Sequence, residues 1–213
     1  MTFTEAIVAA RLAGRPYRYA ASLPSTMDAA RAWLLDDAPH GAMVIAGEQT
    51  AGRGRVGRVW LNSGGTALAC SVILRMTVAL LPHASMFGGL VVLDMLTTLG
   101  VPDAQLKWPN DVLAGGRKIC GVLVEPIWDG AVLRGAVLGI GVNVSGTFAD
   151  AEIAATATTI ADMLGQPPVL STVFSTFVES FDRRLPDLHT SQLVHALRAR
   201  LGTIGQRVRI EGH

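Results

Sequence analysis

The chain has almost no net charge, few aromatic residues and only two cysteines. The low charge and the scarcity of cysteine each argue against a class of protein. A net charge of +1 leaves no excess of cations for releasing counterions from a phosphate backbone, so a general nucleic-acid binder is excluded. No CxxC, HxH or HxxxH pair occurs, which argues against a structural zinc site. Cys70 and Cys120 lie far apart in apolar runs, so we expect two reduced core residues.

Long hydrophobic runs and a basic leader are also missing. No stretch of about 18 apolar residues occurs, so we expect no membrane span. The N-terminal MTFTEAIVAARLAG carries Glu5 and has no basic region before its apolar part, which excludes a secretory signal. The sequence therefore predicts a cytoplasmic protein, and its 213 residues, half of them apolar, suffice for one good core.

The most distinctive segment is the glycine- and arginine-rich stretch from residue 47 to 66, GEQTAGRGRVGRVWLNSGGT. Arg53, Arg55 and Arg58 alternate with glycines, and Trp60 follows. Glycine lets a backbone turn tightly beside a ligand, and arginine offers a fork of donors suited to carboxylate or phosphate. We expect this loop to hold an anion.

Two common phosphate-binding motifs do not fit this loop. Gly52, Gly54 and Gly57 have the spacing of the dinucleotide fingerprint, but no amphipathic helix follows, and no Asp or Glu lies between Gly57 and Asp94. The same glycines resemble the start of a P-loop, yet Arg-Val stands where Lys and Ser or Thr should be. Both interpretations are dropped. From the loop alone, a solvated basic loop or a plain surface turn remains open.

Periodicity and turn signals predict an alternation of strands and helices. Strands flanking the loop would hold its ends while its middle moves as a lid. Ser25 or Thr26 would cap a helix carrying Ala30, Trp33 and Leu34. The expected helices are 3–13, 82–99, 159–164, 171–185 and 191–201, and the expected strands are 17–23, 42–47, 68–74, 119–127, 131–144 (after a hairpin turn at Asp129-Gly130) and one starting at 204.

Two further stretches combine polar residues with turn signals. Lys107-Trp108-Pro109-Asn110-Asp111 is followed after six residues by Lys118, which opens a strand ending in Gly-Val-Leu-Val-Glu. By itself this is an ordinary connection between strands. Leu-Gly-Ile-Gly-Val-Asn, with Gly139, Gly141 and Asn143, is by itself a glycine-weakened strand with a bulge.

Taken together, these stretches resemble the biotin protein ligases, which join biotin to carboxylase carrier domains. Similar are the loop from Gln49 to Trp60, the Lys-Trp-Pro-Asn-Asp run with its later lysine, and Gly-x-Gly-x-Asn. The resemblance covers nearly all of residues 15–205. One departure is Met27, where the family's Ser-Thr-Asn has asparagine.

The resemblance implies an α+β fold, a mixed sheet flanked by helices of the class II aminoacyl-tRNA synthetase/biotin synthetase-like type. Residues 1–202 would be the catalytic domain, and residues 203–213 the first strand of a truncated or absent SH3-like domain. No room is left before residue 15 for a DNA-binding helix-turn-helix, so a monofunctional ligase is expected, without DNA or membrane contacts. A homodimer is compatible with this expectation.

The implied reaction forms biotinyl-5′-AMP from biotin and ATP with Mg²⁺, then transfers biotin to a lysine of a biotin carboxyl carrier protein domain. Lys118 would bind the biotin carboxylate and the α-phosphate, with Arg53 beside it. Asp111 would steer the incoming lysine amine or merely cap a turn. Arg55 and Arg58 would close the loop, and Trp60 would stack on adenine.

The resemblance also implies two sets of binding residues and no resident metal site. The biotin set is Ser25, Thr26, Gln49, Arg53, Gly54, Arg55, Lys118, Gly121, Gly139 and Gly141. The nucleotide set is Arg55, Arg58, Trp60, Asn110, Lys118 and Asn143. Two alternatives stay open. The first is a lipoate ligase, whose loop would be expected to have the sequence Arg-Arg-x-Ser-Gly-Gly-Gly, and the loop of this chain has a different sequence. The second is a non-catalytic biotin sensor, which the presence of Lys118 and Arg53 disfavours.

Overall fold

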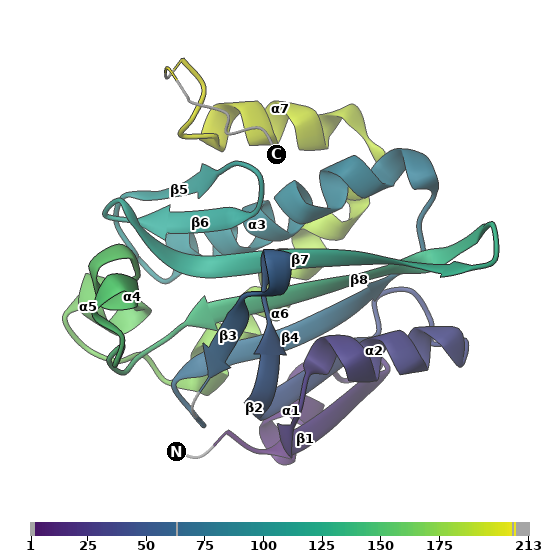
Figure 1. Ribbon diagram of the computed structural model, residues 1–213, viewed down its shortest axis with the longest axis horizontal. Coiled ribbons are helices and arrows are strands. Elements are labelled where there is room, and N and C mark those ends of the chain that lie inside the picture. The colour runs from purple at the N-terminus through teal and green to yellow at the C-terminus, as the bar shows by residue number, and fades with distance from the viewer. Residues whose placement is uncertain (1–2, 63, 206, 208–213) are drawn as a thin grey trace.

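A computed structural model describes residues 3–62, 64–205 and 207, and it has the predicted α+β architecture (Figure 1). Eight strands of the described residues form one sheet in the order β1-β2-β4-β8-β7-β6-β5, and β3 pairs with β2 off this path. The strands are β1 Tyr17–Leu23, β2 Met43–Arg53, β3 Val59–Asn62, β4 Ala67–Leu74, β5 Ala104–Lys107, β6 Asp111–Ala114, β7 Arg117–Asp129 and β8 Val132–Asn143.

The sheet is mixed, as predicted. β1 runs parallel to β2, whereas the other strand pairs are antiparallel. The predicted hairpin turn joins β7 to β8, and Gly130 takes a positive φ of 58° there, a conformation that glycine adopts without strain. β7 and β8 are the longest strands, and they cross the middle of the sheet.

Helices cover both faces of the sheet, and they divide its core in two. α1, α3 and α6 bury one face, where Phe87, Phe174, Phe177 and Phe181 pack. α2 packs on the other face, against apolar residues of β2, β4 and β8, and the loop after β2 lies on that same side (Figure 1). The helices are α1 Glu5–Arg11, α2 Thr26–Leu35, α3 Leu81–Thr98, α4 Ala151–Thr156, α5 Ile160–Leu164, α6 Leu170–Arg184 and α7 Ser191–Arg200.

α3 is the most hydrophobic helix of the described chain. By length and composition alone, with a mean hydropathy of 1.6, the stretch Val78–Thr98 could cross a membrane. In this fold 56% of that stretch is buried, against β5 to β8 and α6, which is the environment of a core helix. Arg184 donates from its Nε to Asp94 at 2.5 Å, so the one acidic residue of α3 is paired.

Strand alternation places small residues on the α2 side of the sheet. In β8, Leu138, Ile140 and Val142 belong to the core under α3. Because successive side chains of a strand point to opposite faces, Gly139 and Gly141 lie on the α2 side. Gly121 of β7 is paired in register with Gly141. A strip of backbone without side chains therefore crosses the centre of this face.

Most predicted elements are confirmed to within two residues, but β3, β5, β6, α4 and the short 3-10 helices Arg55–Gly57, Val78–Leu80 and Leu185–His189 were missed. β2 is longer than predicted because the first half of the loop pairs with β3. Cys70 and Cys120 are free and buried, as expected. Ile204 and Gly205 lie in a turn, and the rest of the strand predicted from 204 falls, apart from Arg207, outside the described residues.

Candidate active site

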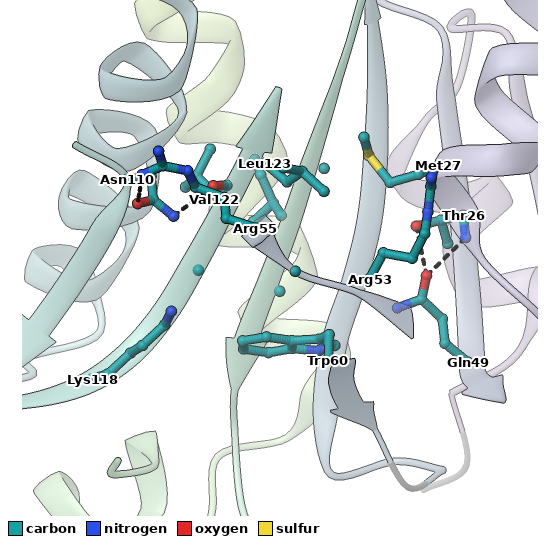
Figure 2. Close-up of a pocket in the computed structure, with 15 residues that line it drawn as sticks. Thr26, Met27, Gln49, Arg53, Arg55, Trp60, Asn110, Lys118, Val122 and Leu123 are labelled. Atoms are coloured by element: carbon teal, nitrogen blue, oxygen red, sulfur yellow. Dashed lines mark hydrogen bonds between the residues drawn. The ribbon is translucent and has the colours of Figure 1, made fainter. Parts of the chain in front are cut away.

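A small cavity opens on the α2 side of the sheet, above the glycine strip. Its walls come from the start of α2, the loop after β2, Trp60 of β3, Asn110, and the central residues of β7 and β8 (Figure 2). Its volume is about 60 Å³. Sites for small organic ligands usually hold about 300–1,000 Å³, so the cavity is nearly closed in this conformation.

Two large side chains fill the space above the glycines. A Cβ added to Gly141 would stand 2.4 Å from Cε2 of Trp60, and one added to Gly139 would stand 2.3 Å from Sδ of Met27. At Gly121 the nearest atoms, at 3.3 Å, belong to Lys118 and again to Trp60. The flat group that lies against this strip is therefore the indole of Trp60, and Met27 forms an apolar wall beside it.

Arg53 is held by two carboxylates from different elements. Its Nη2 lies 2.9 Å from Oδ1 of Asp28 on α2 and 3.0 Å from Oε2 of Glu125 on β7. Sequence reasoning assigned no role to Asp28 or Glu125, because neither lies near Arg53 in the sequence. The guanidinium therefore connects the end of β2 to α2 on one side of the site and to β7 on the other.

Arg55 makes the second tie of the loop. Its Nη1 donates to Oδ1 of Asn110 at 2.9 Å, and Asn110 in turn donates from Nδ2 to the carbonyl of Val122 at 3.1 Å. Asn110 therefore connects the loop to β7. Both the oxygen and the nitrogen of its side-chain amide are hydrogen-bonded to other protein groups.

Lys118 lies at the other end of the cavity from Arg53, on the same face of the sheet (Figure 2). Its Nζ is 2.7 Å from Oδ1 of Asp111, and both side chains are partly exposed. Lys118 lies at the start of β7, and Asp111 starts the adjoining strand β6. Three cations, Arg53, Arg55 and Lys118, thus converge on the cavity, and two of them are paired with carboxylates.

Thr26 and Gln49 form the polar end of the cavity. Oε1 of Gln49 accepts from the backbone N–H of Thr26 at 2.7 Å and from its hydroxyl at 2.9 Å. Ser25 occupies the N-cap position of α2, but its side chain makes no capping hydrogen bond, so the predicted cap is only positional. Its Oγ is buried without a hydrogen-bond partner among the described residues.

The structure brings most of the predicted site residues together, but not all. Those lining the cavity are Thr26, Gln49, Arg53, Gly54, Arg55, Trp60, Asn110, Lys118, Gly121, Gly139 and Gly141. Ser25, Arg58, Asp111 and Asn143 are not among its lining residues. Met27, Val122, Leu123 and Ile140 complete the lining; Met27 and Leu123 pack on the α2 side of the sheet, whereas Val122 and Ile140 belong to the core under α3.

Asn143 lies beside a second cavity on the far side of Trp60. This cavity holds about 520 Å³ and is bounded by the segment 145–150 after β8. Asn143 is buried, and its Nδ2 donates to the carbonyls of Thr158 at 3.1 Å and Lys118 at 3.5 Å. Trp60 borders both cavities and so separates them.

The open mixed sheet, with the glycine strip and three cations lining one cavity, defines an α+β domain with a cationic pocket. A family model described as the biotin/lipoate A/B protein ligase family matches residues 19–143, more than half of the chain. The chain belongs to this family.

Two proteins with similar sequences are named as ligases. The chain is 38% identical to the biotin--[acetyl-CoA-carboxylase] ligase of Mycobacterium tuberculosis over 179 residues, 80% of this chain and 65% of that protein. It is 31% identical to the bifunctional ligase/repressor BirA of Bacillus spizizenii over 182 residues, 83% of this chain and 56% of the relative. The chain thus spans between half and two thirds of the length of these relatives.

A solved structure shares the fold over most of both chains. The biotin protein ligase from Aquifex aeolicus in complex with biotin and ATP superposes with a TM-score of 0.74 at 26% identity, covering 88% of this chain and 78% of that one. The fold class predicted from the sequence is therefore confirmed.

Proposed function

We propose that this chain activates biotin with MgATP to biotinyl-5′-AMP and transfers the biotinyl group to a lysine of a carboxylase biotin carrier domain. The observation that carries the proposal is that Lys118, Arg53 and Arg55 line one cavity, together with the polar side chains of Thr26 and Gln49. Membership of the family and the ligands named for the Aquifex aeolicus structure support it.

The first step joins two anions, which is unfavourable unless cations flank them. A biotin carboxylate oxygen attacks the α-phosphorus, the bond to the β-phosphate oxygen breaks, and pyrophosphate leaves. Lys118 would bind the carboxylate and an α-phosphate oxygen together, and each such charge-assisted hydrogen bond contributes roughly 1.5–3 kcal/mol. Mg²⁺ enters with ATP as part of the substrate and neutralises phosphate charge.

Substrate entry requires the loop to open. A cavity of about 60 Å³ cannot accept biotin, so Trp60 must leave the glycine strip and Arg53 must exchange Asp28 and Glu125 for a ligand anion. Arg55 likewise exchanges Asn110 for the ligand. The loop then closes over the mixed anhydride and excludes the water that would hydrolyse it.

The second step needs a group that receives the incoming amine. Asp111 neutralises Lys118 in this structure at 2.7 Å. When Lys118 turns to the phosphate, the carboxylate of Asp111 is released to hold or deprotonate the carrier lysine. The amine then attacks the biotinyl carbonyl, the bond to the phosphate oxygen breaks, and AMP leaves.

The proposal has a nucleotide part. The second cavity, beyond Trp60, would hold the adenosine, with Asn143 at its edge, Trp60 stacking on adenine and Arg58 closing over the phosphates. Residues 1–202 would act as the catalytic domain in the cytoplasm, with residues 203–213 opening an SH3-like strand. The partner would be the carrier domain, without DNA contacts, and a homodimer is compatible with the site.

Incubation with biotin, MgATP and an isolated biotin carrier domain tests the proposal. We expect pyrophosphate release that depends on biotin, and a mass increase of one biotinyl group on the carrier by mass spectrometry. Pyrophosphate release with lipoate alone would instead identify a lipoate ligase. Biotin binding without pyrophosphate release or carrier modification would identify a biotin sensor.

A further inference from the structure

Trp108 is a large apolar side chain that the fold leaves in water. It is 61% exposed, whereas Trp60 packs over the glycine strip and Trp33 lies under the guanidinium of Arg18, whose Cζ is 4.4 Å from the ring centroid. Trp108 lines neither of the two cavities of the site. Tryptophan is enriched at protein–protein interfaces, where it often anchors the contact. The exposure of Trp108 therefore indicates a surface that meets a partner.

The strand register places the residue before it on the face of the active site. Lys107 ends β5 and is paired with Asp111 of β6, which is paired in turn with Gly121 of β7. Paired residues of antiparallel strands lie about 5 Å apart and point to the same face. Leu106 and Val112, the next residues along the two strands, point the other way, into the core under α3. Lys107, Asp111 and the glycine strip therefore share the face on which the cavity opens.

Trp108 is also close to the loop that covers the cavity. It follows Lys107 in the turn to β6 and stands two residues before Asn110, whose Oδ1 accepts from Arg55 at 2.9 Å. Asn110 and Arg55 both line the cavity. Val56 follows Arg55 and is 84% exposed. Two exposed apolar residues from remote segments therefore lie next to the same hydrogen bond at the rim of the cavity.

The second step of the reaction limits where the carrier domain can sit. Its lysine amine has to reach Asp111, and the stem of a lysine is only about 6 Å long, so the carrier backbone must come within roughly 10 Å of that carboxylate. The backbone of Lys107 lies about 5 Å from that of Asp111, and Trp108 is about 4 Å further along the chain. Both residues are exposed. A folded domain that delivers its lysine to Asp111 therefore covers them.

We propose that Trp108, Lys107 and Val56 form the docking surface for the biotin carrier domain, with Trp108 as its anchor. The proposal rests on the proposed function, which supplies the acceptor lysine and its destination at Asp111. An indole buries a large apolar area with little loss of side-chain freedom, which suits an anchor. Lys107 adds a positive charge beside it, so the carrier surface around the acceptor lysine is expected to present carboxylates.

Trp108→Ala separates docking from chemistry. We expect the KM for an isolated carrier domain to rise roughly tenfold or more, because interface tryptophans are often the residues that carry the binding energy. Biotin-dependent ATP–pyrophosphate exchange should stay within about threefold of wild type, since it needs no carrier. Hydroxylamine attacks biotinyl-5′-AMP without docking, giving biotinyl hydroxamate and AMP, and that rate should also stay within about threefold.

Trp128→Ala is the matched control. Trp128 is likewise an exposed tryptophan, at 45%, but it lies near the end of β7, about 23 Å along the strand from Gly121. Its removal should leave the KM for the carrier within about threefold of wild type. Trp108→Phe keeps an aromatic ring and should raise KM less than Trp108→Ala does. Lys107→Glu should raise KM at low salt, and the effect should shrink as salt screens the charges.

The outcomes separate the docking surface from the proposed function. A wild-type KM in Trp108→Ala, with exchange intact, overturns the docking surface and leaves the proposed function standing. Loss of exchange in Trp108→Ala overturns it too, because Trp108 would then belong to the adenylation site. A rise in KM confined to Trp128→Ala would place the carrier at the β7–β8 hairpin instead.

Sedimentation of the same proteins tests the competing partner. If the wild type is a dimer and Trp108→Ala a monomer, the surface joins two copies of this chain, and the carrier proposal is overturned. An unchanged oligomeric state together with the raised KM supports it. A wild type without biotin-dependent exchange refutes the proposed function, and the docking surface with it.

Discussion

The indole of Trp60 rests against Gly141 so closely that a Cβ there would stand 2.4 Å from the ring. This contact holds the arginine loop against the sheet, and it fills the space above the glycine strip. The closed loop and the closed cavity are therefore one and the same arrangement.

Gly141→Ala should push Trp60 off the strip and open the loop. Weakening closure by about 1.4 kcal/mol gives roughly tenfold more open loop, so trypsin should cut after the loop arginines about tenfold faster. Gly64→Ala is the control, because a Cβ there meets nothing within 4 Å. Equal cleavage rates in the two variants would show that the glycine strip does not hold the loop.

Lys118→Ala should abolish adenylation. It removes the cation placed between the two reacting anions, and losses of about 10²- to 10³-fold are typical for such groups. ATP–pyrophosphate exchange in the presence of biotin is the measurement. Lys118→Arg keeps the charge but not the compact ammonium, so partial activity is expected. Exchange within about threefold of wild type in Lys118→Ala would remove this residue from the mechanism.

Arg55→Gly should leave exchange within about threefold of wild type, yet release free biotinyl-5′-AMP into solution. The variant loses the guanidinium that binds Asn110 at 2.9 Å in the ligand-free loop and that would bind the ligand in the closed complex, so the lid holds the intermediate less well. Chromatography of the nucleotide products measures the escape. Arg198→Ala, an exposed arginine on α7, should release none. Equal loss of exchange in Arg55→Gly and Lys118→Ala would contradict this division of roles.

Arg75→Ala should destabilise the fold by about 2–4 kcal/mol. The Arg75 guanidinium caps the end of α2 by donating to the carbonyls of Leu34 at 3.0 Å and Ala38 at 2.8 Å, and it also donates to that of Arg134 at 2.8 Å. Urea unfolding measures the change. Arg75→Lys should recover only part of it because an ammonium lacks the planar fork. Full stability in Arg75→Ala would mean that water replaces these bonds.

The fold should lose stability at alkaline pH through its two thiols. Burial raises the pKa of Cys70 from 9.0 to about 12, and it also raises the pKa of Cys120. Above pH 9 the unfolded thiols ionise while the folded ones keep their protons. The free energy of unfolding therefore falls as pH rises, by about 1.4 kcal/mol per pH unit for each thiol. The contribution is complete below pH 9 and is lost toward pH 12.

Urea unfolding between pH 8 and about 11 checks this slope. Cys70→Ala/Cys120→Ala, compared with the wild type at each pH, should show a flatter decline, because other titrating groups contribute equally to both proteins. Parallel declines would mean that the thiols ionise alike in the folded and unfolded chains.

Much of the site was predictable from local sequence. The alternation of glycines with arginines predicted an anion-holding loop, and Gly139 and Gly141, two positions apart, had to share a face. The partners of Arg53 were not predictable, because Asp28 and Glu125 come from a helix and a strand remote in sequence. β5 and β6, with four residues each, were too short for a periodic pattern.

The sequence by itself determined the chemistry available to this protein: which cations, amides and glycines it has, and the strands and helices in which they sit, because periodicity and turn residues act locally. Tertiary structure alone decided how they are connected. It placed Trp60 over the glycine strip, paired Lys118 with Asp111, and brought Gln49 and Ser71 into hydrogen-bond contact with Thr26. The physical reason is that ion pairs and buried hydrogen bonds depend on distances of about 3 Å, which only packing of remote segments can set.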